Sequence, residues 1–222
     1  MKLYTGDLSP YSAKVRMQIY AKGITDIAFE PPPGFLTGDF PKTSPLGRIP
    51  VLDVEGDMIP ESEVIADYLE EIYPEPSLLG RSPRETAQIR TVSRIADIYL
   101  MNNMFMVLPQ ANRKARNEGI RDLLTGQVKR GVRALEHYIG TGGFAVGDRL
   151  TIADCSLVPA LFLIENVIGT VDVADPIPDS PKVAAYWAAI QQNPHAAKTL
   201  VELHRGLEER RTLMRAALKA QS

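Results

Sequence analysis

Cysteine and histidine are scarce in this sequence of 222 residues. It has one cysteine, Cys155, and three histidines, His137, His195 and His204. A single thiol excludes a disulfide within the chain and a cluster of thiolate ligands around a metal. The histidines show no HExxH or similar spacing, so we predict no metal site. So little cysteine fits a reducing compartment.

Long apolar runs and a strong charge of one sign are also missing. No stretch approaches the length of about 18 consecutive apolar residues that would predict a membrane span. The N-terminal sequence MKLYTGDLSP lacks the apolar region of a secretory signal. A net charge of −2 argues against a general nucleic-acid binder, because phosphate binding needs a basic surface. We therefore expect a cytoplasmic protein that binds neither membranes nor nucleic acid.

The first part of the chain alternates short apolar runs with helical patterns. This alternation is typical of a mixed α/β layer. In chain order we expect a strand at Lys2–Tyr4, a helix at Tyr11–Lys22, a strand at Ile27–Glu30, a loop at Phe35–Leu46, strands at Ile49–Val54 and Met58–Ile59, and a helix at Ser62–Ile72.

From Arg84 onward the pattern is helical throughout. We expect helices at Arg84–Asn117 (kinked or interrupted by Pro109), Ile120–Ile139, Thr151–Val167, Pro181–Asn193 and Ala196–Ala220. The charged end of the last helix is most simply a solvated surface. The sequence thus predicts two domains, residues 1–79 and 84–222, joined by the short linker LLGRSPR.

Three short motifs in the first part could carry chemistry. In the turn Ser9-Pro10-Tyr11-Ser12 a helix begins, and its N-terminal N–H groups favour an anion such as a thiolate; alternatively, Ser9 is only an N-cap. A cis bond before Pro50 would expose the backbone of Ile49 to a peptide ligand, although this proline could also simply begin a strand. The helix start at Glu61-Ser62 is either another anion site or a plain cap.

Together these motifs, in this order, make the sequence resemble the glutathione transferases. The thioredoxin-like half of that family has a sequence close to LGRIPVL followed by ESEVIADYLEE. The C-terminal signature of the family resembles GDRLTIADCSLVP in this chain. The resemblance implies a thioredoxin-like N-terminal domain, an all-α C-terminal domain and a homodimer. It also implies that glutathione is held by Ile49 and the cis Pro50, by Glu61 and Ser62, and by Arg48.

The C-terminal signature also contains a predicted folding element. Thr151 and Asp154, three residues apart at a helix start, predict a capping box, which is not chemistry. Cys155 follows within that helix, and we interpret it as a small buried residue and not as a nucleophile.

The resemblance implies that one side chain near the first turn activates the glutathione thiol. Because SPYS contains no cysteine, disulfide exchange through a protein thiol is excluded. We predict that the Ser9 hydroxyl donates to the sulfur, with Tyr4 and Ser12 as alternatives and Tyr11 lining the pocket. A small hydrophobic electrophile would bind between the halves. Its predicted pocket residues are Tyr4, Tyr99, Met104 and Phe105.

Three functional hypotheses follow from the resemblance. The first is a transferase that joins glutathione to a soft electrophile. The second is a glutathione-dependent isomerase, dehalogenase or peroxidase, although the isomerase branch usually carries a Ser-Ser-Cys run that this turn lacks. The third is a non-catalytic glutathione-binding or interaction protein on the same fold.

Overall fold

A four-stranded sheet forms the base of the first part of the molecule. The computed structural model describes residues 1–34 and 37–219. The strands are β1 (Lys2–Tyr4), β2 (Ala28–Glu30), β3 (Val51–Val54) and β4 (Asp57–Pro60), in the order β2-β1-β3-β4. Only β1 and β2 are parallel, since β3 is antiparallel to both of its neighbours. The predicted α/β layer is therefore confirmed.

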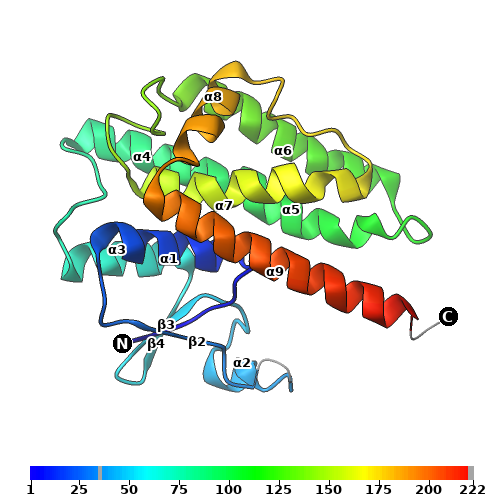
Figure 1. Cartoon of the computed structure of the whole chain (residues 1–222), viewed down its shortest axis with the longest axis horizontal. Coiled ribbons are helices and arrows are strands. Elements are labelled where there is room, and N and C mark those ends of the chain that lie inside the picture. The colour runs from blue at the N-terminus through cyan, green and yellow to red at the C-terminus, as the bar shows by residue number, and fades with distance from the viewer. Residues whose placement is uncertain (35–36, 220–222) are drawn as a thin grey trace.

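The two faces of this sheet pack against different helices. Leu3 lies opposite Leu52 in the register, and both face the helices α1 (Pro10–Lys22) and α3 (Ser62–Ile72). The adjacent pair, Tyr4 and Val51, points to the other face, because side chains alternate along a strand. There they meet the short helix α2 (Phe40–Thr43), which lies below the sheet in Figure 1.

The loop predicted at Phe35–Leu46 therefore contains a helix, α2, that the sequence did not predict. Gly, Pro, Thr and Ser dominate this stretch, and these residues favour turns over helices. The single helical turn forms because it buries Phe40, which the local sequence does not indicate. Phe35 and Leu36 lie outside the described residues.

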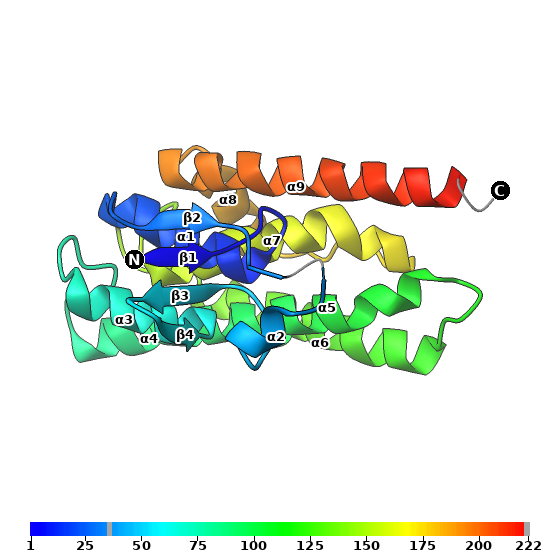
Figure 2. The same ribbon diagram turned by 90° about the horizontal axis from the view of Figure 1, so that it is seen from below.

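The second part of the molecule is helical. It lies on the side of α1 and α3 that faces away from the sheet (Figures 1 and 2). Pro109 lies in a 3-10 turn at Leu108–Ala111, so the predicted interruption is confirmed. The elements are α4 (Pro83–Ile95), a π-helical turn (Ala96–Met101), α5 (Asn102–Val107), α6 (Glu118–Tyr138), α7 (Ile152–Val167), α8 (Pro181–Ile190) and α9 (Pro194–Lys219), with a further 3-10 turn at Ile168–Val171; Ala220 lies outside the described residues.

The π-helical turn was not predicted from the sequence. In this turn the Asn102 N–H donates to the Asp97 carbonyl five residues earlier, and the Asn103 side chain donates to the carbonyls of Ile98 at 2.8 Å and Tyr99 at 3.0 Å. The turn faces the boundary between the two parts of the molecule, where π-helical turns are often functional.

Helix α7 forms the centre of the helical part. By length and composition Ile152–Val171 could cross a membrane, with a mean hydropathy of 1.6, but 78% of that window is buried inside the molecule. A core helix of a soluble protein passes the same test. Cys155 is fully buried in α7, and burial raises the pKa of its thiol well above the usual value, so it is an inert core residue as predicted.

The capping box predicted at the start of α7 is present. The Asp154 carboxylate accepts hydrogen bonds from the Thr151 N–H at 2.8 Å and, with its other oxygen, from the Ala145 N–H at 2.8 Å. Asp154 thus joins the helix start to the preceding loop. Burial raises the pKa of this carboxyl from 3.8 to about 6, although these hydrogen bonds oppose the shift.

This pKa shift predicts how stability depends on pH. The folded state holds a proton on Asp154 that the unfolded state releases between pH 3.8 and about 6. The resulting stabilisation is complete below this window and is lost as the pH rises through the folded pKa. Compared with Asp154→Asn, the native protein should therefore gain about 1 kcal/mol of unfolding free energy in urea between pH 7 and pH 5.

The exposed Glu71→Gln is the matched control and should keep the native pH profile. Parallel profiles for the native protein and Asp154→Asn would contradict the expectation.

Candidate active site

The turn between β1 and α1 carries Ser9 at the cap position of α1. Its Oγ accepts a hydrogen bond from the Ser12 N–H at 3.2 Å, and Pro10 is the first helical residue. The predicted cap is therefore confirmed. Because the cap bond uses only an oxygen lone pair, the Ser9 O–H can still donate. The same residue lines a cavity of about 840 Å³, so capping and donation to a ligand are compatible.

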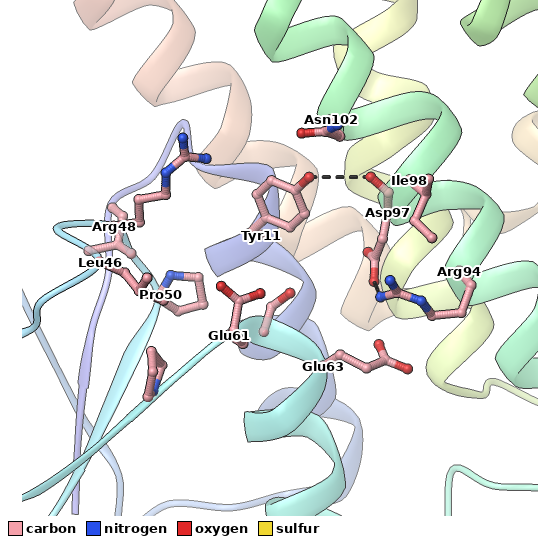
Figure 3. Close-up of a pocket in the computed structure, with 13 residues that line it drawn as sticks. Tyr11, Leu46, Arg48, Pro50, Glu61, Glu63, Arg94, Asp97, Ile98 and Asn102 are labelled. Atoms are coloured by element: carbon pink, nitrogen blue, oxygen red, sulfur yellow. Dashed lines mark hydrogen bonds and ion pairs between the residues drawn. The ribbon is translucent and has the colours of Figure 1, made fainter.

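The loop before β3 reaches a second, smaller cavity. The bond between Ile49 and Pro50 is cis, as the resemblance implied. Both residues, together with Arg48, line a cavity of about 250 Å³ (Figure 3). The loop thus places the backbone of Ile49 and the cationic side chain of Arg48 at the same cavity.

The start of α3 forms the floor of the smaller cavity. Glu61 and Ser62 both line it, and the first turn of α3 opens toward it, where N–H groups favour an anionic ligand. Glu61 has φ 69° and ψ 116°, a conformation that costs a non-glycine residue about 1–3 kcal/mol. Strained backbone conformations are common at ligand-binding sites, so the conformation of Glu61 supports a functional role for the start of α3.

The opposite wall comes from the helical part. It consists of Arg94, Asp97, Ile98 and Asn102. The Tyr11 hydroxyl donates to the Asp97 carbonyl at 3.3 Å, as the dashed line in Figure 3 shows. Burial, and then the nearby Asp97 carboxylate, raise the pKa of Tyr11 to about 12, so the phenol stays protonated near neutral pH.

Tyr11 also lines the larger cavity. Its ring stacks on Phe105 with 5.8 Å between centroids and 13° between planes. The cavities share Tyr11, Arg48, Ile49 and Asn102, while the larger one adds Leu8, Ser9, Gly47, Phe105, Met106, Leu108 and Arg210. A polar, peptide-sized space therefore adjoins an apolar one that has the Ser9 hydroxyl in its wall.

Four residues considered at the sequence level lie away from both cavities. Tyr4 packs on Phe40 under the sheet, and its hydroxyl donates to Asp53 at 3.3 Å. Met104 is fully buried in the helical core, and Tyr99 packs against α6, where its Cβ would lie 2.8 Å from a Cβ added at Gly131. Ser12 is also fully buried. Their positions were misjudged because the sequence alone did not locate which side of each element faces the boundary.

A buried ion network lies beneath the smaller cavity. The Lys14 side chain in α1 is buried, and its Nζ contacts the carboxylates of Glu63 and, at 2.9 Å, Asp97. Burial raises the pKa of Asp97, whereas at Glu63 the attraction of Lys14 outweighs burial and lowers the pKa. Arg94 contacts Asp97 at 3.1 Å. The network ties α1 and α3 to the helical part, and nothing in the local sequence around Lys14 signals it.

Comparison with known proteins gives consistent matches. The family model "Glutathione S-transferase, N-terminal domain" matches residues 3–77, and "Glutathione S-transferase, C-terminal domain" matches residues 115–189. A maleylacetoacetate isomerase of Pseudomonas aeruginosa is 32% identical over 205 residues, covering 86% of this chain and 94% of that protein. A glutathione S-transferase of Pseudomonas putida is 27% identical over 215 residues, covering 91% and 92% of the two chains.

A solved structure has the same fold. The glutathione S-transferase from Methylobacillus flagellatus with glutathione bound superimposes with a TM-score of 0.76. The match has 22% sequence identity and covers 89% of this chain and 98% of that one.

Proposed function

The chain belongs to the glutathione S-transferase family of enzymes, and we propose that its two adjoining cavities bind glutathione and an electrophile with an activated carbon–carbon double bond. The observation that carries this proposal is the arrangement of the cavities. The smaller one offers backbone, a helix N-terminus and Arg48, while the larger is mostly apolar and has Ser9 in its wall. A tripeptide lying in the first would extend its thiol into the second.

Glutathione is the cosubstrate, and each of its parts has a proposed partner. The backbone of Ile49 beside the cis Pro50 pairs with the cysteinyl unit. Glu61 and Ser62 hold the γ-glutamyl end, and Arg48 holds the glycine carboxylate. The shared lining of the smaller cavity supports this assignment. The homodimer, the cytoplasmic location and the domain limits at residues 79 and 84 are further parts of the proposal.

The sulfur then lies beside Ser9 at the N-terminus of α1. Donation from the Ser9 hydroxyl and the positive end of the helix dipole both favour the thiolate over the thiol. Tyr11, whose pKa is about 12, adds no negative charge nearby because it remains a neutral phenol. The nucleophile therefore belongs to the cosubstrate, and the protein supplies the field that ionises it.

We propose cis–trans isomerisation as the outcome of the attack. The thiolate electron pair forms a carbon–sulfur bond at the β-carbon of an unsaturated ketone, and the π electrons move to the carbonyl oxygen as an enolate. The former double bond then rotates. The enolate re-forms the double bond and expels the thiolate, so no glutathione or proton is consumed. The named isomerase of Pseudomonas aeruginosa, 32% identical to this chain, supports this outcome.

Conjugation is the second candidate, and it shares the first step. Here the enolate carbon takes a proton from water and the carbon–sulfur bond remains. The SPYS turn favours it, because the Ser-Ser-Cys run usual in the isomerase branch is absent. The relative named a glutathione S-transferase in Pseudomonas putida supports it as well.

Proton NMR of a cis-configured unsaturated ketone with enzyme and glutathione tests the proposal. We expect the trans ketone to accumulate at an enzyme-dependent rate while the concentration of glutathione stays constant. Loss of one glutathione for each ketone would instead establish conjugation. S-methylglutathione, which lacks the thiol, is the control and should support neither reaction. Binding of glutathione without any turnover would overturn the proposal in favour of a non-catalytic binding protein.

A further inference from the structure

The larger cavity has an unbalanced positive charge. Two of its lining residues, Arg48 and Arg210, are cations, and none is an acid. Within the part of the chain that the structure describes, neither guanidinium has a carboxylate partner. The remaining wall is largely apolar, and a charge beside apolar surface is screened less than one in open water.

Arg210 belongs to α9, which is pressed against the turn that carries Ser9. A Cβ added at Gly206 would lie 2.6 Å from the backbone nitrogen of Leu8, so only glycine permits this approach of helix and turn. The next residue back, Arg205, pairs with Asp7 at 2.6 Å. Arg210 lies four residues after Gly206 and so on the same face of α9.

A buried arginine also links the same turn to α9. The Arg16 side chain in α1 is almost fully buried, and its Nε donates to Glu202 of α9 at 2.8 Å. Its two other nitrogens donate to the carbonyls of Gly6 at 3.0 Å and Asp7 at 3.1 Å. These contacts hold the part of α9 that carries Arg210 close to the Ser9 turn, and the Arg210 side chain itself is exposed to solvent.

From this geometry we propose that Arg210 binds a carboxylate of the electrophile, so that the enzyme selects anionic unsaturated ketones over neutral ones. The inference rests on the proposed function and adds a substrate class to it. Arg48 borders both cavities and is assigned to glutathione, which leaves Arg210 as the uncompensated cation of the larger one. A guanidinium matches a carboxylate with two parallel hydrogen bonds, which would orient the double bond toward the sulfur.

The test compares an unsaturated keto acid with its methyl ester as electrophiles. The native enzyme should prefer the acid. Arg210→Gln should lower kcat/KM for the acid by about tenfold or more, the range expected for a lost charge-assisted hydrogen bond. The same variant should leave the ester and the KM for glutathione within about twofold. Arg210→Lys should retain part of the preference, because it keeps the charge without the bidentate geometry.

Arg211→Gln is the matched control, since Arg211 is the adjacent residue, pairs with Glu208 and lines neither cavity. It should behave as the native enzyme does. Equal losses for acid and ester in Arg210→Gln, or a raised KM for glutathione, would overturn the inference while the proposed function stands. Absence of turnover with both electrophiles in the native enzyme would instead refute the proposed function itself.

Discussion

Replacement of Ser9 by alanine should return the pKa of bound glutathione toward that of a free thiol, about 8.5. In the native complex we expect a pKa lower by about 1.5–2 units, which corresponds to about 2–3 kcal/mol of preference for the thiolate. One charge-assisted hydrogen bond and the helix dipole together supply this amount. Because the helix dipole remains in Ser9→Ala, the pKa should rise by about 1–1.5 units, and the thiolate fraction near neutral pH, and with it kcat/KM, should fall by about tenfold.

Difference absorbance at the thiolate band, titrated against pH, measures this pKa directly. Alanine also removes the cap of α1, which costs about 1 kcal/mol, whereas glycine at a cap position costs only a few tenths. Ser9→Gly is therefore the matched control. It should raise the thiol pKa as much as Ser9→Ala does while keeping nearly native stability. A pKa that remains depressed in both variants would move the role to the backbone of the turn.

Replacement of Lys14 by methionine should cause the largest loss of stability. The change leaves the carboxylates of Glu63 and Asp97 beneath the smaller cavity without their shared cation. Breaking a buried ion pair from one side costs about 3–5 kcal/mol, and we expect the lower end because Arg94 remains beside Asp97. For a chain of this size a loss of about 3 kcal/mol lowers Tm by about 6–12 °C.

Thermal unfolding of two further proteins separates charge from packing. Lys129→Met replaces an exposed lysine and should leave Tm unchanged. The triple variant Lys14→Met, Glu63→Gln, Asp97→Asn removes the cation and also neutralises both of its carboxylate partners. It should recover much of the stability lost in Lys14→Met, because no unpaired charge is left buried. A native Tm in Lys14→Met alone would show that the network contributes nothing to holding the two parts together.

Elements with strong local signals were predicted well from the sequence. The helix Ser62–Ile72 has the expected bounds, since its apolar face and the following Pro74 are local features. The caps at Ser9 and Thr151 follow from side chains that reach backbone groups within three residues. The position of Pro50 at a cavity came from resemblance and not from spacing.

Features that depend on distant partners could not be predicted in this way. Lys14 and Arg16 look like surface residues of an amphipathic helix, yet both are buried because α1 lies between the sheet and the helices α7 and α9. Arg210 was expected on a solvated surface and is indeed exposed, but its place in the lining of the larger cavity depends on how α9 crosses the first turn. Met104 and Tyr99 were expected in the pocket and do not line it, because the sequence does not show which side of their helical segment faces the boundary.

The brace between α9 and the Ser9 turn has a consequence for how the enzyme is made. Arg16 and Glu202 are 186 positions apart, and Asp7 and Arg205 are 198 apart. A ribosome adds residues in order at about 5–20 per second, so the turn is exposed for on the order of ten seconds before α9 has been synthesised. Until then the turn lacks the contacts that Glu202 and Arg205 make with Arg16 and Asp7. The position of the Ser9 turn is therefore fixed only after the residues of α9 that contact it have been added to the chain.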